Sequence, residues 1–252
     1  MSTKDGYLLA AGDDAELERL RLQARVWEPD TEIWLDEIGV QPGWRCIDLG
    51  CGAMGILGPL ARRVGPDGRV VGLDMDSRQL AGARSFVADN RLDVVEIVEG
   101  DAYRTGLPAA SFDLVHVRFV LAPVGRDEAL LAEMLRLVRA GGSLAIQEPD
   151  SASWSCFPPN PAWDGRTFGM LRRIGLKDVR LRAAVVALQD CPPYMRLPIQ
   201  FVTTLRARIL DEGLMTPEDL ATAMADCEAV AKEPDTIVIS FVVTQVWGRK
   251  PA

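Results

Sequence analysis

Histidine is almost absent from this chain, because His116 is the only one among 252 residues. A single histidine excludes the HExxH motif and any histidine-rich metal cluster. The cysteines offer no replacement, since none lies at the CxxC spacing that zinc and redox sites use. The five are Cys46, Cys51, Cys156, Cys191 and Cys227. We therefore expect no metal site, and the odd, scattered cysteines indicate a reducing compartment.

Positive charge is also in deficit, with 28 basic residues against 36 acidic ones and a formal net charge of −8. Such a balance does not indicate the basic face that neutralises nucleic-acid phosphates or anionic lipid. Long apolar runs are missing too, because no stretch approaches the roughly 18–20 residues of a membrane-spanning helix and the start lacks an apolar signal region. The sequence thus predicts a cytoplasmic protein with a small-molecule partner, without nucleic acid or membrane. A homo-oligomer is allowed but not required.

Apolar residues, in contrast, make up 48% of the chain, which is enough for a full core. From residue 44 onward, short β-rich runs alternate with helical patterns, as in a parallel sheet built from βαβ units. The runs cover residues 44–50, 69–74, 94–98, 112–117 and 143–148. The helical pattern before the last of them is expected to stop at residues 141–142, both glycine. Four βαβ crossings fit this order.

The remaining segments are predicted to decorate one domain. Residues 13–39 form an amphipathic lead-in broken at Pro29, and a sixth strand is expected over residues 178–188. A long, uninterrupted last strand over 236–248 has no crossover helix immediately before it, which favours an antiparallel direction. Residues 216–219 (Thr-Pro-Glu-Asp) are typical of a helix start. We divide the chain into a helical cap (1–40), a cofactor-binding core (44–150) and a helical insertion or lid (191–235).

A glycine-rich loop follows the first predicted strand and places Gly50, Gly52 and Gly55 before a helix. Glycines at such a turn let the backbone approach a nucleotide closely and direct the helix N-terminus at it. With Asp74 about 20 residues further on, the spacing also satisfies the dinucleotide fingerprint of NAD enzymes. The loop alone leaves both ligand classes open, beside its interpretation as a structural turn.

Three further features favour one of these ligands. Asp48 precedes the loop, where an NAD site normally has an apolar residue; its carboxylate can organise loop amides and face a cationic amine. Residues 99–102 (Glu-Gly-Asp-Ala) place an acid where an adenine amino group could donate, and residues 111–113 and 137–142 flank the next two strands. Over residues 44–148 these motifs together resemble the class I S-adenosylmethionine-dependent methyltransferases. The likeness is greatest to their small-molecule branch, which includes ubiquinone and menaquinone biosynthesis enzymes and many bacterial natural-product enzymes.

The resemblance implies a Rossmann-like α/β fold, with a seven-stranded, mostly parallel sheet, an antiparallel last strand, helices on both faces and helical lid insertions. It implies S-adenosyl-L-methionine as cofactor and S-adenosyl-L-homocysteine as product. Gly50 and Gly52 would lie along the methionine part, Asp74 would accept both ribose hydroxyls, and Met75 would lie against the adenine. The acid and the amide at residues 101–102 would bind the adenine edge. The predicted cofactor contacts also include Gln23, Asp48, Cys51, Gly55, Gly100, Asp101, Ala102 and Arg118.

No catalytic residue is assigned, because in-line methyl transfer from a sulfonium can be accelerated by positioning and exclusion of water alone. The candidates are His116 and Glu148. His116 lies inside the fourth strand, whereas ligands bind beyond strand ends, which favours a structural role. Glu148 closes the fifth strand, where substrate contact and a solvated turn fit equally. Resembling enzymes often carry a histidine after the fourth strand, where this chain has Ala-Pro at 122–123.

The acceptor is predicted to be a small, largely apolar metabolite, methylated at oxygen, nitrogen or carbon. Candidates for its pocket are Tyr7, Phe119, Asp150, Trp154, Phe157 and Tyr194. Ordinary packing is the alternative for each aromatic residue. Asp76 is expected to cap a helix rather than bind a ligand. Between Asp164 and Gly165, similar enzymes usually carry an extra helix, so we predict a segment either missing from this sequence or lost; an intact mass well above 27.6 kDa would support the former.

Two other functions stay open. The same pocket could serve an S-adenosylmethionine-binding cyclase, pericyclase or non-transferring binder, and release of S-adenosylhomocysteine with an acceptor separates these from a methyltransferase. An NAD-dependent short-chain oxidoreductase is less favoured, because none of Tyr7, Tyr103 and Tyr194 begins a Tyr-x-x-x-Lys pair. A thermal-shift comparison of NAD with S-adenosylmethionine distinguishes the ligands, since a ligand of the native state stabilises it.

Overall fold

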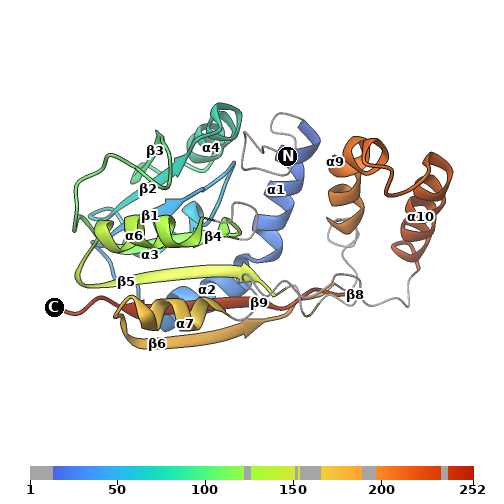
Figure 1. Ribbon diagram of the computed structural model, residues 1–252. Helices are drawn as coiled ribbons and strands as arrows, with labels where there is room; N and C mark the ends of the chain where they lie inside the picture. Colours follow the sequence, from blue (N-terminus) through green and yellow to red (C-terminus); the bar gives the residue numbers. More distant parts are fainter. Residues whose placement is uncertain (1–13, 122–125, 151–152, 154–165, 189–196, 234–237) are drawn as a thin grey trace.

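The computed structural model describes residues 14–121, 126–150, 153, 166–188, 197–233 and 238–252. Seven strands form one sheet in the order β3-β2-β1-β4-β5-β9-β6 (Figure 1). They are β1 (Arg45–Leu49), β2 (Arg69–Asp74), β3 (Val95–Glu99), β4 (Phe112–Arg118), β5 (Val138–Pro149), β6 (Lys177–Ala184) and β9 (Val243–Arg249). Only β9 runs antiparallel to its neighbours, β5 and β6, in this sheet. The predicted mostly parallel sheet with an antiparallel last strand is confirmed.

Helices cover both faces of this sheet. One face lies under α2 (Glu28–Ile38), α3 (Leu57–Val64) and α4 (Ser77–Asp89), and the other under α6 (Asp127–Leu137) and α7 (Arg166–Arg173). Side chains that alternate along each strand divide between the two layers: Cys46 packs with α2 and α3, whereas Ile47 and Leu49 pack on the α6 side. Because β1 to β5 run parallel, their carboxyl ends lie at one common edge of the sheet, where ligands bind in such folds.

Three helices stand beside the sheet rather than on its faces. Figure 1 shows α1 (Asp14–Val26) at the strand edge, with α9 (Leu197–Asp211) and α10 (Pro217–Val230) beyond it. α1 contacts α9, and α9 contacts α10. Thr216 caps α10 as predicted, since its hydroxyl accepts the Asp219 N–H at 3.1 Å. Within the described ranges, no helix combines the length and the apolar character needed to cross a membrane.

The two predicted C-terminal strands are each divided, which corrects the prediction of long, continuous ones. β7 (Ala187–Leu188) and β8 (Val238–Ile239) pair in a separate two-stranded sheet. At the break, Ser240 donates its N–H to the Val186 carbonyl, and its hydroxyl accepts the Val186 N–H, both at 2.9 Å. This local pairing takes β7 and β8 out of the main sheet. The apolar residues of the sequence continue through the break, so their pattern does not indicate where the strands divide.

The helix before β5 also ends earlier than predicted, at Leu137 instead of residues 141–142. The Ser111 N–H donates to the Leu137 carbonyl at 2.9 Å, and the next residue, Val138, already pairs with Phe112 in the sheet. This long-range pairing overrides the local helical pattern.

Two smaller expectations need correction. Residues 100–111 join β3 to β4 without a helix, so three of the four predicted crossings are helical. The N-terminal lead-in breaks at Trp27 rather than Pro29, because Pro29 lies in the first turn of α2, where its missing N–H costs no hydrogen bond.

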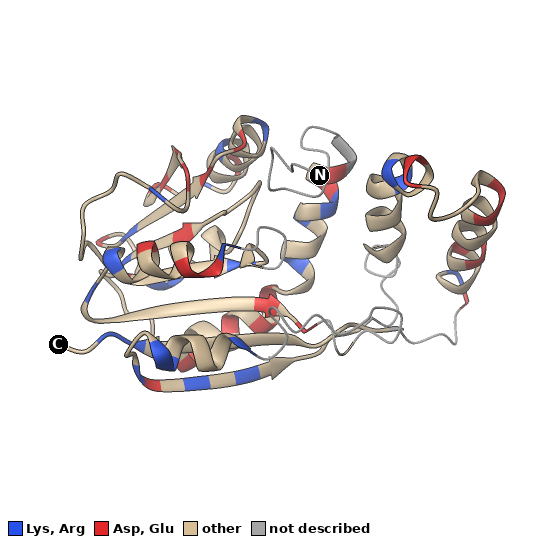
Figure 2. Cartoon of the chain, viewed as in Figure 1, with Lys and Arg blue, Asp and Glu red and all other residues tan. Residues whose placement is uncertain are grey.

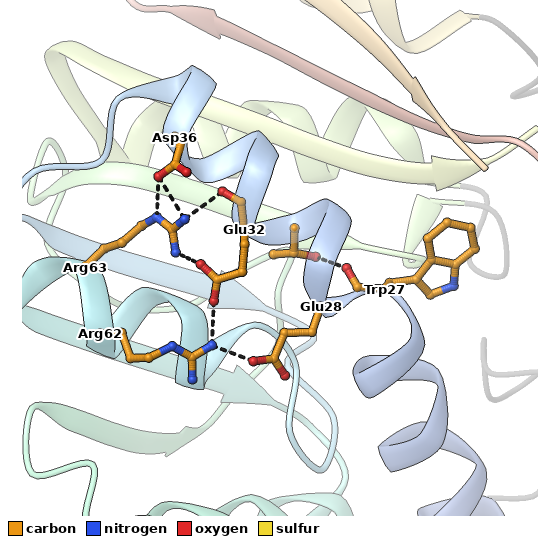
Figure 3. A network of polar contacts seen from close by, with 7 residues as sticks. Trp27, Glu28, Glu32, Asp36, Arg62 and Arg63 are labelled. Carbon is orange, nitrogen blue, oxygen red and sulfur yellow. Dashed lines mark hydrogen bonds and ion pairs between the residues drawn. The ribbon is translucent and has the colours of Figure 1, made fainter. Parts of the chain in front are cut away.

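Charged residues of both signs are interspersed over most elements, as Figure 2 shows, and the edge strand β6 carries Lys177, Arg180 and Arg182. Charges on an edge strand discourage pairing with another chain. A second group of charges joins α2 to α3 (Figure 3): Arg62 contacts Glu28 and Glu32, and Arg63 contacts Glu32 and Asp36.

Replacing Arg63 by methionine should lower the free energy of unfolding by about 1 kcal/mol. Arg63 is only 15% exposed and donates to both the Glu32 carbonyl (2.6 Å) and the Asp36 carboxylate (2.8 Å). The matched change Arg62→Met should cost less, because Arg62 is 54% exposed and its ion pairs are more strongly screened. Urea denaturation measures both, and equal losses would contradict this ranking.

Candidate functional site

The loop between β1 and α3 turns through three glycines with left-handed backbone angles, φ +69° at Gly50, +56° at Gly52 and +51° at Gly55. Residues with side chains rarely adopt such angles. A Cβ added at Gly55 would lie 2.2 Å from the Asp48 carboxylate, and one at Gly50 would lie 2.7 Å from the Val120 side chain. The chain's own groups thus require glycine here, and the loop lies at the common strand edge.

Asp48 lies beneath this loop and is buried. One oxygen accepts the Ile56 N–H at 3.0 Å, and the other lies 2.7 Å from His116 Nδ1. His116 is fully buried inside β4, with the Trp34 ring packed edge-on at 5.5 Å. Asp48 therefore organises a loop amide in the way expected of it. The burial and pairing of His116 support its structural interpretation over a catalytic one.

Asp74 closes β2 beside the same loop. Its Oδ2 accepts the Gly52 N–H at 2.8 Å and its Oδ1 accepts the Asp76 N–H at 3.0 Å. Burial raises the pKa of the Asp74 carboxyl, although these backbone hydrogen bonds oppose the shift. Each carboxylate oxygen has a second lone pair, so Asp74 can still accept hydroxyl donors. Met75 follows with its side chain 75% exposed, in a position to cover a flat ring.

The end of β3 supplies the next acid. Asp101 is exposed and accepts the Tyr103 N–H at 2.8 Å, while the Gly100 N–H donates to the Asp74 carbonyl at 2.9 Å. Ala102 follows in the same turn. Asp76, by contrast, caps α4 by accepting the Arg78 N–H at 2.9 Å, which agrees with the expected capping role.

Arg118 closes β4 on the other side of the loop. Its Nη2 donates to the Gly55 carbonyl at 2.9 Å, whereas Nη1 is buried and has no hydrogen-bond partner among the described residues. Burial lowers the pKa of this guanidinium, and Asp48 and Glu28 oppose the shift. An unpaired, buried cationic donor at a ligand-binding edge fits an anionic ligand group such as a carboxylate.

Glu148 closes β5 and is buried, which corrects its interpretation as a solvated turn. Its Oε1 accepts the N–H groups of Val120 and Leu121, both at 2.9 Å, because the turn after β4 directs these amides at it. A buried acid with these partners is not placed as an accessible base. Phe119 begins that turn, and Asp150 donates its N–H to the Val242 carbonyl at 2.8 Å.

The other predicted site residues have contacts that do not indicate a ligand, or lie outside the described residues. Cys51 is buried, burial raises the pKa of its thiol, and its Sγ donates to the Gly52 carbonyl at 3.5 Å. Gln23 accepts a hydrogen bond from Arg19 at 2.9 Å. Four of the predicted acceptor contacts lie outside the described residues, namely Tyr7, Trp154, Phe157 and Tyr194. The junction between Asp164 and Gly165 also lies outside them. In the part of the chain that is described, no three side chains of metal-ligating type gather together.

Sequence reasoning missed several residues that shape this edge. Trp27 packs against Phe119 and Phe241, with ring centroids 6.5 and 5.7 Å away. Trp34 packs on His116, and Val120 packs on Gly50. The apolar pattern of the N-terminal helices marks both tryptophans as core residues, but nothing local indicates which strand they contact.

The donors and acceptors at this edge fit S-adenosylmethionine part by part. Asp74 suits vicinal hydroxyls, Met75 and Asp101 suit the adenine face and amino group, and Arg118 suits the methionine carboxylate. Gly50 and Gly52 contribute no side chains of their own to the loop, and the side chains of Val120 and Gln79 lie against them.

Comparison with known proteins agrees with this fit. A family described as a methyltransferase domain matches residues 41–164. The ubiquinone/menaquinone biosynthesis C-methyltransferase UbiE of Bordetella parapertussis is 32% identical over 61% of this chain and 57% of its own length. The chain spans about half the length of such curated relatives.

Solved structures with under 25% identity show the fold. An S-adenosylmethionine-dependent methyltransferase from Aquifex aeolicus has a TM-score of 0.58 and 24% identity, covering 69% of this chain and 92% of its own. The [4+2]-cyclase SpnF has a TM-score of 0.58 and 20% identity, covering 89% and 82%. Residues 41–164 of this chain thus match a methyltransferase domain, and the strand order and the glycine loop make them similar to the class I S-adenosylmethionine-dependent methyltransferases.

Proposed function

We propose that this chain binds S-adenosylmethionine at the edge formed by β1, β2 and β4 and transfers its methyl group to a small, largely apolar metabolite. The observation that carries the proposal is the glycine loop, which Asp74 holds on one side through Gly52 and Arg118 holds on the other through Gly55. The buried, unpartnered Nη1 of Arg118 adds a place for the methionine carboxylate.

The cofactor, when bound, supplies an electrophilic methyl group on a sulfonium. The chain's residues bind and orient: Asp74 accepts ribose hydroxyls, and Arg118 pairs with the carboxylate. Of the two candidate bases, His116 is buried against Asp48, and Glu148 accepts two amides. Positioning and exclusion of water therefore account for the acceleration, with the acceptor supplying the nucleophile.

The acceptor lies on the side of Phe119 and Asp150 in this proposal, with the helices over residues 191–235 as a lid and residues 1–40 as a cap. The rings of Phe119 after β4, Trp27 between α1 and α2, and Phe241 before β9 make this side apolar. The biosynthetic role of the quinone-pathway relative supports an apolar metabolite. A cytoplasmic location and the absence of nucleic-acid partners belong to the same proposal, supported by scattered cysteines and a net charge of −8.

Turnover with labelled S-adenosylmethionine tests the proposal. The purified chain is incubated with prenylated naphthoquinols, phenols and amines, and mass spectrometry follows S-adenosylhomocysteine and methylated product. Equal amounts of both are expected with at least one acceptor class. Stoichiometric cofactor binding without turnover over all of them would favour a cyclase or a non-transferring binder. Stabilisation by NAD in place of S-adenosylmethionine would overturn the methyltransferase proposal and its cyclase or binder alternative alike.

A further inference from the structure

The buried side chain of Glu148 lies at the carboxyl end of β5. Glu148 pairs with Thr244 of β9, whose hydroxyl donates to the Glu148 carbonyl at 3.0 Å. From this position Oε1 accepts the amides of Val120 and Leu121, which lie 28 and 27 residues earlier in the chain. The contact ties the turn after β4 to the end of β5.

That turn has a backbone shape that its sequence does not favour. Phe119 has φ +57°, a left-handed angle that bulky side chains rarely adopt and that costs free energy. Its own N–H donates to the Gln147 carbonyl at 2.9 Å, and the next two amides donate to Glu148. These three hydrogen bonds hold the chain in the unfavourable shape.

The turn after β4 places two neighbouring side chains, Val120 and Phe119, in different contacts. Val120 packs against Gly50, so closely that a Cβ at Gly50 would lie 2.7 Å from it. Phe119 packs edge-on against Trp27 and Phe241, with both centroid distances 6.5 Å. The first contact supports the cofactor loop, and the second forms part of the apolar side assigned to the acceptor.

We propose that Glu148 is a positioning residue for the cofactor loop. It acts through the turn at residues 119–121, which it holds by hydrogen bonds so that Val120 supports Gly50 and Phe119 keeps its place among the rings. The inference rests on the proposed cofactor site, but it requires no particular acceptor. It also replaces both earlier interpretations of Glu148, as a substrate contact and as a solvated acid.

The test compares Glu148→Met, which cannot accept the amides, with Glu148→Gln, whose amide oxygen still can. Calorimetry with S-adenosylhomocysteine should give about a tenfold higher Kd for the methionine variant and about a threefold change or less for the glutamine variant. Hydrogen exchange of the Val120 and Leu121 amides should accelerate in the methionine variant and stay slow in the glutamine variant.

Asp113→Leu is the matched control. Asp113 also accepts a backbone amide, that of Arg45 at 2.7 Å, but at the opposite end of β4. This variant should lose stability without changing the Kd for S-adenosylhomocysteine. The proposal is overturned if the control weakens binding as much as Glu148→Met does. It is equally overturned if Glu148→Met keeps wild-type affinity, or if the glutamine variant is as weak as the methionine one.

A second variant covers failure of Glu148→Met to fold. Val120→Ala keeps both amides and removes the side-chain contact with Gly50, so a Kd about threefold higher is expected, and an unchanged Kd would overturn the proposal. The wild-type titration is performed first. If the wild type does not bind S-adenosylhomocysteine, the proposed function fails, whereas exchange at residues 120–121 still tests the turn.

Discussion

Replacing Asp74 by alanine is expected to weaken S-adenosylhomocysteine binding by about 1–3 kcal/mol, a rise in Kd of roughly 5- to 150-fold. Two losses add here. The ribose hydroxyls lose their acceptor, and the Gly52 N–H loses the 2.8 Å hydrogen bond that fixes the glycine loop. Isothermal titration calorimetry measures the effect directly.

Asp76→Asn is the control for this variant. Asp76 lies two residues further on and caps α4 through the Arg78 N–H. Asparagine caps helices as well as aspartate does, so the Kd should stay within about twofold of wild type. If Asp76→Asn weakens binding and Asp74→Ala does not, the ribose acceptor is misassigned.

The affinity of the wild type should also depend on pH through Asp74. Burial raises the pKa of this carboxyl above its ordinary value. Hydroxyl donors bind the ionised form better, so affinity should fall as the pH drops through the raised pKa. The sign for stability is opposite: a raised carboxyl pKa means that the ligand-free chain gains stability from this group as the pH falls. If the Kd for S-adenosylhomocysteine does not change as the pH drops through the pKa of Asp74, the role of Asp74 is contradicted.

Replacing Asp48 by alanine should have the largest effect on stability, lowering the free energy of unfolding by about 3–5 kcal/mol. The substitution leaves a fully buried His116 and the Ile56 N–H without their acceptor. The glycine loop should also loosen, because the Asp48 carboxylate packs against Gly55.

Urea denaturation, read by tryptophan fluorescence and by circular dichroism, gives this loss. Asp113→Ala is the comparison, because Asp113 also bonds a backbone amide but is more exposed, and it should cost markedly less. The double variant Asp48→Ala with His116→Ala should cost less than the sum of the single changes, since each removes the same interaction. Additive losses, or a loss below about 1 kcal/mol for Asp48→Ala, would show that the pair is not coupled.

The sequence predicts best what is decided locally. The ends of β2 and the cap at Asp76 follow from nearby residues, because glycines, capping acids and β-rich runs act within a few positions. The glycine loop between β1 and α3 and the position of Asp74 at the end of β2 are likewise predictable, since strand, loop and helix occur in order along the chain.

Long-range contacts account for what the sequence does not reveal. Asp48 and His116 are 68 residues apart, and only the neighbouring positions of β1 and β4 join them. From its sequence context Glu148 fits a substrate contact or a solvated acid at a strand end equally, because nothing near it in sequence indicates the two amides that it accepts. The end of α6 at Leu137 is set by pairing between Val138 and Phe112 across the sheet.

The most direct test of the central claim is a calorimetric titration of the wild-type chain with S-adenosylhomocysteine, with NAD titrated in parallel. The account predicts one S-adenosylhomocysteine bound per chain, affinity lost in Asp74→Ala, and no heat from NAD. Binding of NAD without binding of S-adenosylhomocysteine would contradict it.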